Sequence, residues 1–225
     1  MSVSGILRGL TLGLACLGLA ACGNAPGREV TAVSVIKGLL DRPAPPATPD
    51  AGQVSQMAAS ALAGTTGQVI VVSIPDRDVL AVMQQIERNG DHVTFGTSDR
   101  RSMTLKNGIL TATRGLGHDL MSVDADRPAA LIRARSEGAA QRVNRYLDGE
   151  DQTAPLTAWC QFKRDDDVYL ETGGTRRPVA QMLESCIAGQ TTFQNLYLID
   201  GGGRIVQSRQ WISPLNGYVT IQSLR

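Results

Sequence analysis

The first apolar segment of the chain is a short run near the N-terminus. Residues 9–20 (GLTLGLACLGLA) are almost entirely apolar or glycine, and the only charge before them is Arg8. A membrane-spanning helix needs about 20 apolar residues, so this run is too short to cross a bilayer comfortably. A charged start, a short apolar stretch and small residues after it predict a cleaved signal peptide over residues 1–21.

The cleavage site carries a more specific pattern. Residues 19–22 (LAAC) match the lipobox of bacterial lipoproteins, in which an aliphatic residue and two small residues precede a cysteine. We therefore expect Cys22 to be the acylated first residue of the mature chain, anchored through more than one acyl chain because a single chain binds only marginally. Gly23, in place of an aspartate, favours the outer membrane. An ordinary secreted protein with a cysteine near its cleavage site is the alternative.

Two short helices and a spacer are predicted before the strands begin. Residues 22–52 combine the lipidated N-terminus with a proline-rich spacer, and apolar spacing within them predicts a helix over residues 29–40. Residues 43–49 (PAPPATP) end that helix and favour an extended, polyproline-like chain. The main domain is expected to span residues 53–225 and to open with a short helix at residues 54–62.

From residue 68 onward the pattern changes to that of β-strands. Stretches of roughly 5 to 10 residues alternate between apolar and polar positions, as short strands do. They are separated by Asn89-Gly90, Asn107-Gly108 and Asn216-Gly217, and Asn-Gly is the strongest short hairpin signal. Asp148-Gly149 and residues 200–203 (DGGG) predict further turns.

The strand pattern leads to a fold class. Residues 193–199 place Phe193, Tyr197 and Ile199 on one face, with Leu196 and Leu198 on the other. Residues 179–186 fit either a strand or a helix, and we favour a strand. Because strands do not alternate with long helical patterns, we predict a mainly β domain with short N-terminal helices. Its core is an antiparallel meander of about ten strands, closed into a sandwich or an open barrel.

The charge balance argues against one class of partner. Removing Arg8 from the 22 basic residues leaves 21, which equals the 21 acidic residues. A balanced surface of this kind gives no electrostatic basis for nucleic-acid binding. No later stretch is long and apolar enough to span a bilayer, so membrane association is expected through the lipid anchor.

Two of the four cysteines belong to the main domain. Cleavage before Cys16 would cut through the apolar run, so Cys16 is not expected to be the acylated residue and leaves with the signal peptide. Cys22 is the expected acylation site. Cys160 and Cys186 remain, and an oxidising envelope favours a disulfide between them. Two free buried thiols are the alternative. A zinc site is not expected, because two distant cysteines lack paired-ligand spacing.

Metal, cofactor and nucleophilic chemistry find little support in the sequence. The two histidines, His92 and His118, lack a second ligand at HExxH spacing, and we interpret His118 as a turn or surface residue. No G-x-S-x-G elbow is present for a Ser-His-Asp hydrolase. Residues 201–203 follow an apolar strand, as a phosphate loop would, but residues 205–211 read as a strand, so a hairpin turn is preferred. We expect no metal, no cofactor and no enzymatic activity.

Paired carboxylates are the catalytic arrangement that is hardest to exclude. A glycosidase pair needs two carboxylates separated by about 5 to 10 Å across a cleft. The acidic residues that would supply such a pair are Asp119, Asp165, Asp166, Asp167, Glu171 and Glu184. Residues 165–167 are more simply interpreted as a solvated turn between two strands.

Two segments carry a more particular pattern than a plain scaffold requires. Residues 107–120 and 193–214 each place polar side chains beside glycines at strand ends. The groove-lining candidates are Arg114, Asp119, Asn195, Tyr197, Ser208, Gln210 and Trp211. The alternative is that these are buried structural groups that make Asx turns and internal hydrogen bonds.

The same two segments resemble the YjbF/GfcB family, the group 4 capsule polysaccharide lipoproteins. The first resembles the pattern G-x-[IL]-x-x-T-x-G-[LI]-x-x-D-L, and the second resembles F-x-N-x-Y-[WL]-x-D followed by G-x-[IVW]-x-x-S-x-Q-x-[IV]-x-P. The matching residues are Gly108, Thr113, Gly115, Leu116, Asp119, Leu120, Phe193, Asn195, Tyr197, Asp200, Gly203, Ile205, Ser208, Gln210 and Pro214. The similarity extends over residues 68–224, and the long proline-rich spacer departs from it.

The resemblance implies a mostly antiparallel β domain on the periplasmic side of the outer membrane. It implies a role in producing or exporting capsule or exopolysaccharide, with a periplasmic protein, an outer-membrane β-barrel or the polysaccharide itself as partners. It carries over no catalytic residue. We therefore favour a non-enzymatic lipoprotein that binds export partners or glycan. A glycan-active lyase or hydrolase and an assembly lipoprotein for outer-membrane proteins are the alternatives.

Overall fold

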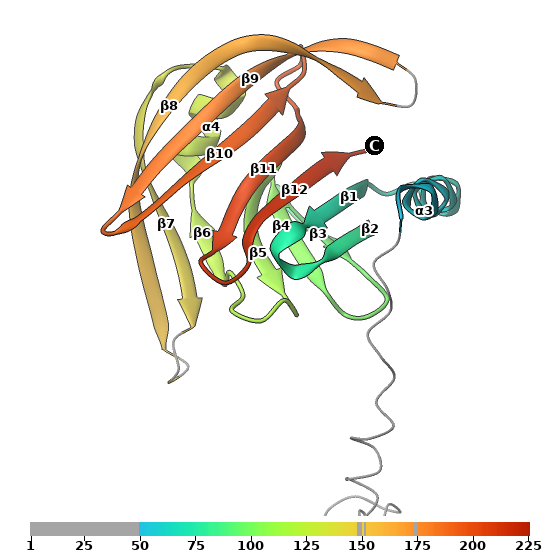
Figure 1. The fold of residues 1–225 in the computed structure, drawn as a ribbon, viewed down its shortest axis with the longest axis horizontal. Helices are drawn as coiled ribbons and strands as arrows, with labels where there is room; N and C mark the ends of the chain where they lie inside the picture. Colours follow the sequence, from blue (N-terminus) through green and yellow to red (C-terminus); the bar gives the residue numbers. More distant parts are fainter. Residues whose placement is uncertain (1–49, 148–149, 151, 173–174) are drawn as a thin grey trace, which may run out of the picture. The chain divides into compact units, whose positions relative to one another are not determined.

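The computed structural model describes residues 50–225, except for residues 148–149, 151 and 173–174. The predicted signal peptide, Cys22, the predicted helix at residues 29–40 and the proline-rich segment lie outside the described residues, as does the Asp148-Gly149 turn. The described residues form twelve strands, two α-helices and one 3-10 helix (Figure 1). In chain order the elements are α3 (Ala51–Gly64), β1 (Val69–Ile74), η2 (Pro75–Arg77), β2 (Val79–Asn89), β3 (His92–Gly96), β4 (Ser102–Lys106), β5 (Ile109–Arg114), β6 (Ser122–Asp124), α4 (Asp126–Ala134), β7 (Gly138–Leu147), β8 (Thr153–Thr172), β9 (Thr175–Ala188), β10 (Thr191–Ile199), β11 (Ile205–Ser213) and β12 (Gly217–Ser223).

The strands form a nearly closed antiparallel barrel. With one exception, each strand pairs with its neighbours along the chain, and β1 also pairs with β12, which joins the two ends of the meander. The exception is the seam between β5 and β6, where the two edges of the sheet lie. The prediction of a mainly β meander is confirmed in its open-barrel form, with twelve strands in the described residues instead of about ten.

The Asn-Gly pairs form hairpin turns, as predicted. They connect β2 to β3, β4 to β5 and β11 to β12. At the β4–β5 turn, Asn107 (φ 53°) and Gly108 (φ 88°) both adopt the left-handed conformation that a tight hairpin requires. A Cβ added to Gly108 would lie 2.7 Å from the Cβ of Ile205, so the close approach of β11 also requires glycine there. Residues 201–203 lie in the turn between β10 and β11, as predicted.

The strand alternation separates a large interior core from a small outer cluster. Phe193, Tyr197 and Ile199 of β10 belong to the main core inside the barrel, as the sequence predicts. Leu198 lies on the other face of β10 in a smaller apolar cluster, against which Leu196 packs. The inward face of the barrel therefore carries most of the buried apolar side chains.

One helix was predicted and the other was not. The predicted helix at residues 54–62 is α3, which extends further at both ends and begins at a capping box formed by Asp50 and Gln53. Helix α4 was missed because its nine residues hold too short an apolar pattern to stand out. It buries Leu131 and Ile132 in the main core. Neither helix in the described part of the chain combines the length and apolar character needed to cross a bilayer.

The prediction of a solvated turn at residues 165–167 is wrong. These residues lie within β8, which runs on without interruption toward its hairpin with β9. The register against β9 shifts between Asp165 and Val168, which marks a β-bulge with one extra residue on β8. The three carboxylates are exposed, so the expectation of solvation holds although the chain does not turn.

Candidate functional site

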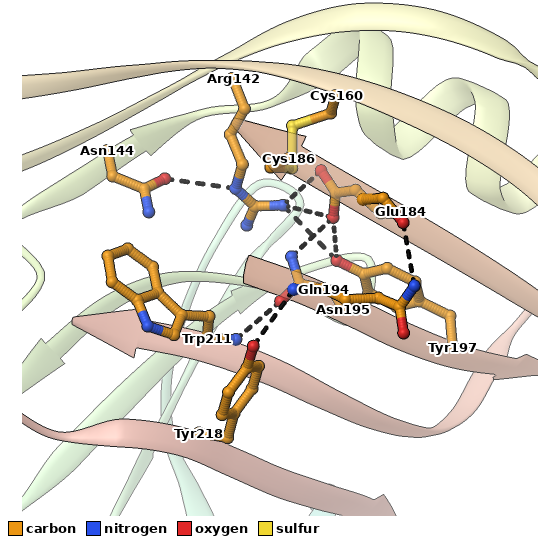
Figure 2. The surroundings of a disulfide bond; sticks show 11 residues. Arg142, Asn144, Cys160, Glu184, Cys186, Gln194, Asn195, Tyr197, Trp211 and Tyr218 are labelled. Atoms are coloured by element: carbon orange, nitrogen blue, oxygen red, sulfur yellow. Dashed lines mark hydrogen bonds and ion pairs between the residues drawn. A yellow bond between two sulfur atoms is a disulfide. The ribbon is translucent and has the colours of Figure 1, made fainter. Parts of the chain in front are cut away.

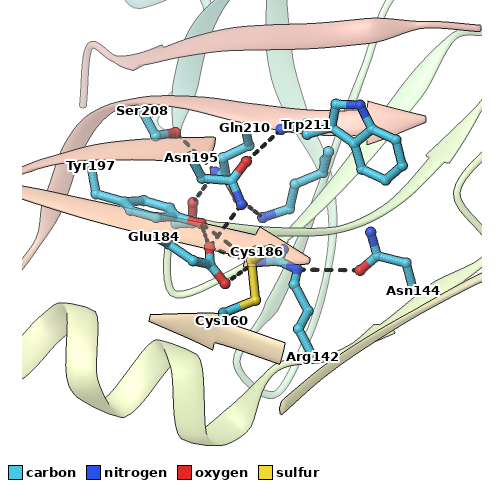
Figure 3. Close-up of polar contacts among 12 residues, drawn as sticks. Arg142, Asn144, Cys160, Glu184, Cys186, Asn195, Tyr197, Ser208, Gln210 and Trp211 are labelled. Atoms are coloured by element: carbon cyan, nitrogen blue, oxygen red, sulfur yellow. Dashed lines mark hydrogen bonds and ion pairs between the residues drawn. A yellow bond between two sulfur atoms is a disulfide. The ribbon is translucent and has the colours of Figure 1, made fainter. Parts of the chain in front are cut away.

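A buried ion pair occupies the interior of the barrel. Arg142 on β7 and Glu184 on β9 have side chains that are 2% and 0% exposed. Nη1 of Arg142 donates to both carboxylate oxygens of Glu184, over 3.0 and 2.9 Å (Figure 3). β8 lies between the two strands; Phe162 faces Glu184, but the inward residues between Phe162 and the level of Arg142, Cys160 and Ala158, are small. Their size leaves room for the pair to meet across β8.

Glu184 accepts two further hydrogen bonds from β10. The Nδ2 group of Asn195 donates to Glu184 Oε2 over 2.8 Å, and the Tyr197 hydroxyl donates to the same oxygen over 2.6 Å. Desolvation and the charge of Glu184 raise the pKa of Tyr197 well above its ordinary value. Desolvation lowers the pKa of Arg142, but the charges of Glu184 and Tyr197 and their hydrogen bonds together outweigh it, and the net shift is upward. The tyrosine therefore stays neutral and the arginine stays charged over the physiological pH range.

The hydrogen bonds continue along β7 and then reach β11. Nε of Arg142 donates to Asn144 over 3.2 Å, and Nδ2 of Asn144 donates to the Tyr146 hydroxyl over 3.3 Å. Tyr146 in turn donates to the carbonyl of Ile212 over 2.5 Å, while the N–H of the preceding residue, Trp211, donates to Asn195 over 2.7 Å. The path thus starts and ends at adjacent residues of β11. We call Arg142, Asn144, Tyr146, Glu184, Asn195 and Tyr197 the interior network.

A disulfide lies beside this network. Cys160 and Cys186 face each other in register on β8 and β9, with a Cα–Cα distance of 4.0 Å, and their sulfur atoms are bonded (Figure 2). Glu184 lies two residues before Cys186 on the same face of β9. The ligand atoms of Cys160, Cys186 and Glu184 gather within 4.8 Å of one another. In this structure the two sulfur atoms form the disulfide and the Glu184 carboxylate pairs with Arg142, so these atoms stabilise the fold instead of binding a metal ion.

The two segments selected from the sequence meet inside the barrel. Gln210 of β11 accepts from the N–H of Leu110 over 2.9 Å and donates to the carbonyl of Gly108, also over 2.9 Å. Its Nε2 group also donates to the Ser208 hydroxyl over 2.9 Å. Leu110 belongs to β5, which has no strand neighbour at the seam. Gln210 therefore satisfies main-chain groups of an edge strand that lies 100 residues earlier in the sequence.

Arg114 and Asp119 hold the loop that crosses the seam. The carboxylate of Asp119 accepts from the Thr113 hydroxyl over 2.8 Å and from the N–H of Gly115 over 2.9 Å. Arg114 donates to the carbonyls of Thr113 and Leu120, over 2.6 and 3.1 Å. In these contacts both side chains bind neighbouring groups of the loop instead of each other. They shape the segment that joins β5 to β6.

Most of the seven predicted groove residues are buried. Asn195, Tyr197, Ser208 and Gln210 are between 0 and 2% exposed, and Trp211 is 6% exposed and stacks on Phe193 with ring centroids 4.5 Å apart. Arg114 is exposed. The interior network joins Asn195 and Tyr197, whereas Ser208 and Gln210 form a separate group. Their role in binding a ligand stays a prediction.

A cleft opens at one end of the barrel. We call it the mouth cleft; it has a volume of ≈ 230 Å³ and is lined by residues from the β2–β3, β4–β5 and β10–β11 turns and from α4. Its apolar lining consists of core residues that include Ile70, Phe95 and Ile221. Ser208 is the predicted groove residue that lines it. The other predicted residues lie elsewhere in the barrel or on the seam loop.

Several structural residues of the interior were not selected from the sequence. Arg142, Asn144 and Tyr146 alternate along β7 and are all buried, and Asn216 donates to the carbonyls of Gly117 and His118 over 2.7 and 3.1 Å. The signal available was the alternation itself, which places Arg142 on the same face as Tyr146. His118 itself is exposed and has a positive φ of 50°, in agreement with the predicted turn.

The comparisons with known proteins agree with this architecture. The crystal structure of the hypothetical lipoprotein YmcC from Escherichia coli (K12) superposes with a TM-score of 0.65, covering 88% of this chain and 98% of that chain. The two sequences are 15% identical, so this similarity establishes the fold alone. No curated protein sequence matches. The family model of the group 4 capsule polysaccharide lipoproteins GfcB and YjbF matches residues 31–224. The chain therefore belongs to the group 4 capsule polysaccharide lipoprotein family.

Proposed function

We propose that this protein is an outer-membrane lipoprotein with a non-enzymatic role in producing or exporting capsule or exopolysaccharide. In this proposal Cys22 carries the lipid anchor and the barrel faces the periplasm, where it binds export partners or the glycan. The observation that carries the proposal is the family match over residues 31–224, together with the lipobox at residues 19–22. Two or more acyl chains give stable anchoring, so the barrel would stay at the membrane surface.

The state of the acidic residues supports a non-enzymatic role. A glycosidase needs two carboxylates that reach substrate across a cleft. Glu184 is fully buried and accepts hydrogen bonds from Arg142, Asn195 and Tyr197, so it has no path to a substrate in this state. Asp119 holds the seam loop. The remaining candidates on β8 are exposed and do not line the mouth cleft.

The anchor is tested by substitution at the lipobox. Cys22→Ala should release the protein from the membrane fraction and reduce polymer at the cell surface to the level of a deletion strain. Gly23→Asp keeps the acylated cysteine and should move the protein to the inner membrane, which separates loss of the anchor from loss of the outer location. Unchanged surface polymer in the deletion strain would overturn the proposed role.

The enzymatic alternative calls for a direct assay. The purified protein is incubated with the polysaccharide of its own organism, and polymer length is followed by size-exclusion chromatography. The proposal expects no change in length over the time in which a known lyase digests the same polymer. Shortening of the polymer would contradict the non-enzymatic role. If the shortening persists in Glu184→Gln but is lost when one of the exposed acidic residues is replaced by its amide, that residue is a catalytic carboxylate.

A further inference from the structure

The mouth cleft combines an apolar floor with a basic rim. Core residues of five strands form the floor, and they are Ile70, Val93, Phe95, Leu105, Ile205 and Ile221. Four arginines stand among the lining residues: Arg88, Arg133, Arg204 and Arg225. Asp91 is the single acidic side chain among them. The lining therefore favours a ligand that is negatively charged at one end.

Two of these arginines are free to bind. Arg204 pairs with Asp200 over 3.3 Å, and Arg225 donates to the carbonyl of Leu62 over 2.9 Å. Arg88, at the end of β2, and Arg133, in the last turn of α4, are exposed and have no protein partner among the described residues. They approach the cleft from different elements of the barrel end. A guanidinium group without a protein partner can give an anion charge-assisted hydrogen bonds, and guanidinium groups suit carboxylate and phosphate oxygens.

The floor determines what the uncharged part of the ligand is. Among the described lining residues, Ser208 is the only polar side chain that is buried, and its hydroxyl already accepts from Gln210. A sugar ring placed on the floor would bring several hydroxyls against apolar side chains that cannot pair with them, and each buried unpaired hydroxyl is unfavourable. An aliphatic chain needs no such partners. An apolar cavity of about 150 Å³ is enough to hold benzene, so ≈ 230 Å³ accommodates a short aliphatic segment.

We propose that the mouth cleft binds an amphipathic anion, with its aliphatic chain on the apolar floor and its carboxylate or phosphate at Arg88 and Arg133. Free fatty acids and lipid phosphates share this chemistry. The inference goes beyond the proposed function and does not depend on it, since a polysaccharide role can hold with or without this site.

The test measures binding of defined probes to the full mature chain carrying Cys22→Ala, so that its own acyl chains do not compete. Isothermal titration uses decanoate and decyl phosphate below their critical micelle concentrations, and uncharged decanol below its solubility limit. We expect one decanoate or decyl phosphate per chain and binding of decanol that is about tenfold weaker or more. Tighter decanoate than decyl phosphate indicates a carboxylate ligand, and the reverse indicates a phosphate. Equal binding of decanol, or no binding of either anion, overturns the proposal.

Variants connect the binding to this cleft. Arg88→Gln with Arg133→Gln should weaken decanoate binding about tenfold or more, because both free guanidinium groups are removed. Arg127→Gln is the matched control, since Arg127 is an exposed arginine of α4 that does not line the cleft. Ser223→Phe places a large ring at the cleft wall and should abolish binding while the melting temperature shows that the chain is folded. Undiminished binding in the double arginine variant, or tighter binding of an acidic oligosaccharide than of decanoate, contradicts the proposal.

Discussion

Arg142 and Glu184 neutralise each other inside the barrel, although β8 separates the strands that carry them. A buried ion pair is not in itself a source of stability, because desolvating two charges offsets most of their attraction. Removing only one of the two partners is unfavourable, because the remaining charge stays buried without a counterion. The intact pair is therefore expected to add little net free energy of unfolding, whereas breaking it on one side is expected to be costly.

This pairing predicts the effect of neutralising one partner. Glu184→Gln leaves the Arg142 guanidinium buried without an anion and should lower the free energy of unfolding by about 3 to 5 kcal/mol in urea titrations. Adding Arg142→Met removes the uncompensated charge and should recover part of this loss. Asp99→Asn, which breaks the exposed pair with Arg101, is the control and should cost about 1 kcal/mol or less. Equal losses in Glu184→Gln and Asp99→Asn would contradict the burial argument.

The disulfide predicts a loss of stability on reduction. Cys160 and Cys186 are 26 residues apart, and a crosslink of this span adds about 3 kcal/mol in the chain-entropy model. Replacing both with alanine should lower the free energy of unfolding by about that amount. Reduced wild-type protein should show the same loss, which distinguishes the crosslink from the effect of the substitutions on packing. Identical unfolding midpoints in reduced and oxidised protein would disprove the contribution.

Replacing Gln210 is expected to loosen the backbone of β5 at the seam. Gln210→Leu keeps most of the side-chain volume but leaves the N–H of Leu110 and the carbonyl of Gly108 without their partner. We expect a loss of about 1 to 3 kcal/mol and faster hydrogen exchange at the Leu110 amide. Gln207→Leu on the same strand points to the other face and is the control. Normal protection of Leu110 in Gln210→Leu would show that the seam does not depend on this contact.

The buried tyrosines predict how stability depends on alkaline pH. Desolvation raises the pKa of Tyr146 from 10.0 to about 12, so the folded chain holds this proton more tightly than the unfolded chain does. The resulting stability is fully present below pH 10 and is lost as the pH rises toward 12. Unfolding midpoints measured across this range, with phenolate absorbance as a second signal, should fall less steeply for Tyr146→Phe. A decline of equal slope in both proteins would contradict the assignment.

Local patterns account for the parts of the fold that could be predicted. The Asn107-Gly108 turn depends on the backbone preferences of these two residue types alone, so it could be predicted from the sequence. The two faces of β10 follow from simple alternation. By contrast, α4 has only nine residues, and the bulge after Asp165 depends on pairing with a distant strand. Such features are determined by tertiary contacts that a local pattern does not contain.

The interior network was harder to predict than the strands that carry it. An arginine in an alternating strand is normally expected to face water, and the partner that compensates the buried charge of Arg142, Glu184, lies 42 residues further along the chain. Asn195 and Gln210 were selected from the sequence as unusual polar residues, and the sequence left open whether they bind a ligand or the protein. In the structure their amide groups bind Glu184, Trp211, Leu110 and Gly108.

The pairing of β1 with β12 has a consequence for how the molecule assembles. Ile70 lies opposite Ser223, so one edge of β1 stays unpaired until β12 has been synthesised. A growing chain can form hairpins one after another, but it cannot complete the twelve-stranded sheet before β12 is available. Contacts of such long sequence separation slow folding, and an emerging chain with an uncovered edge strand is exposed to aggregation.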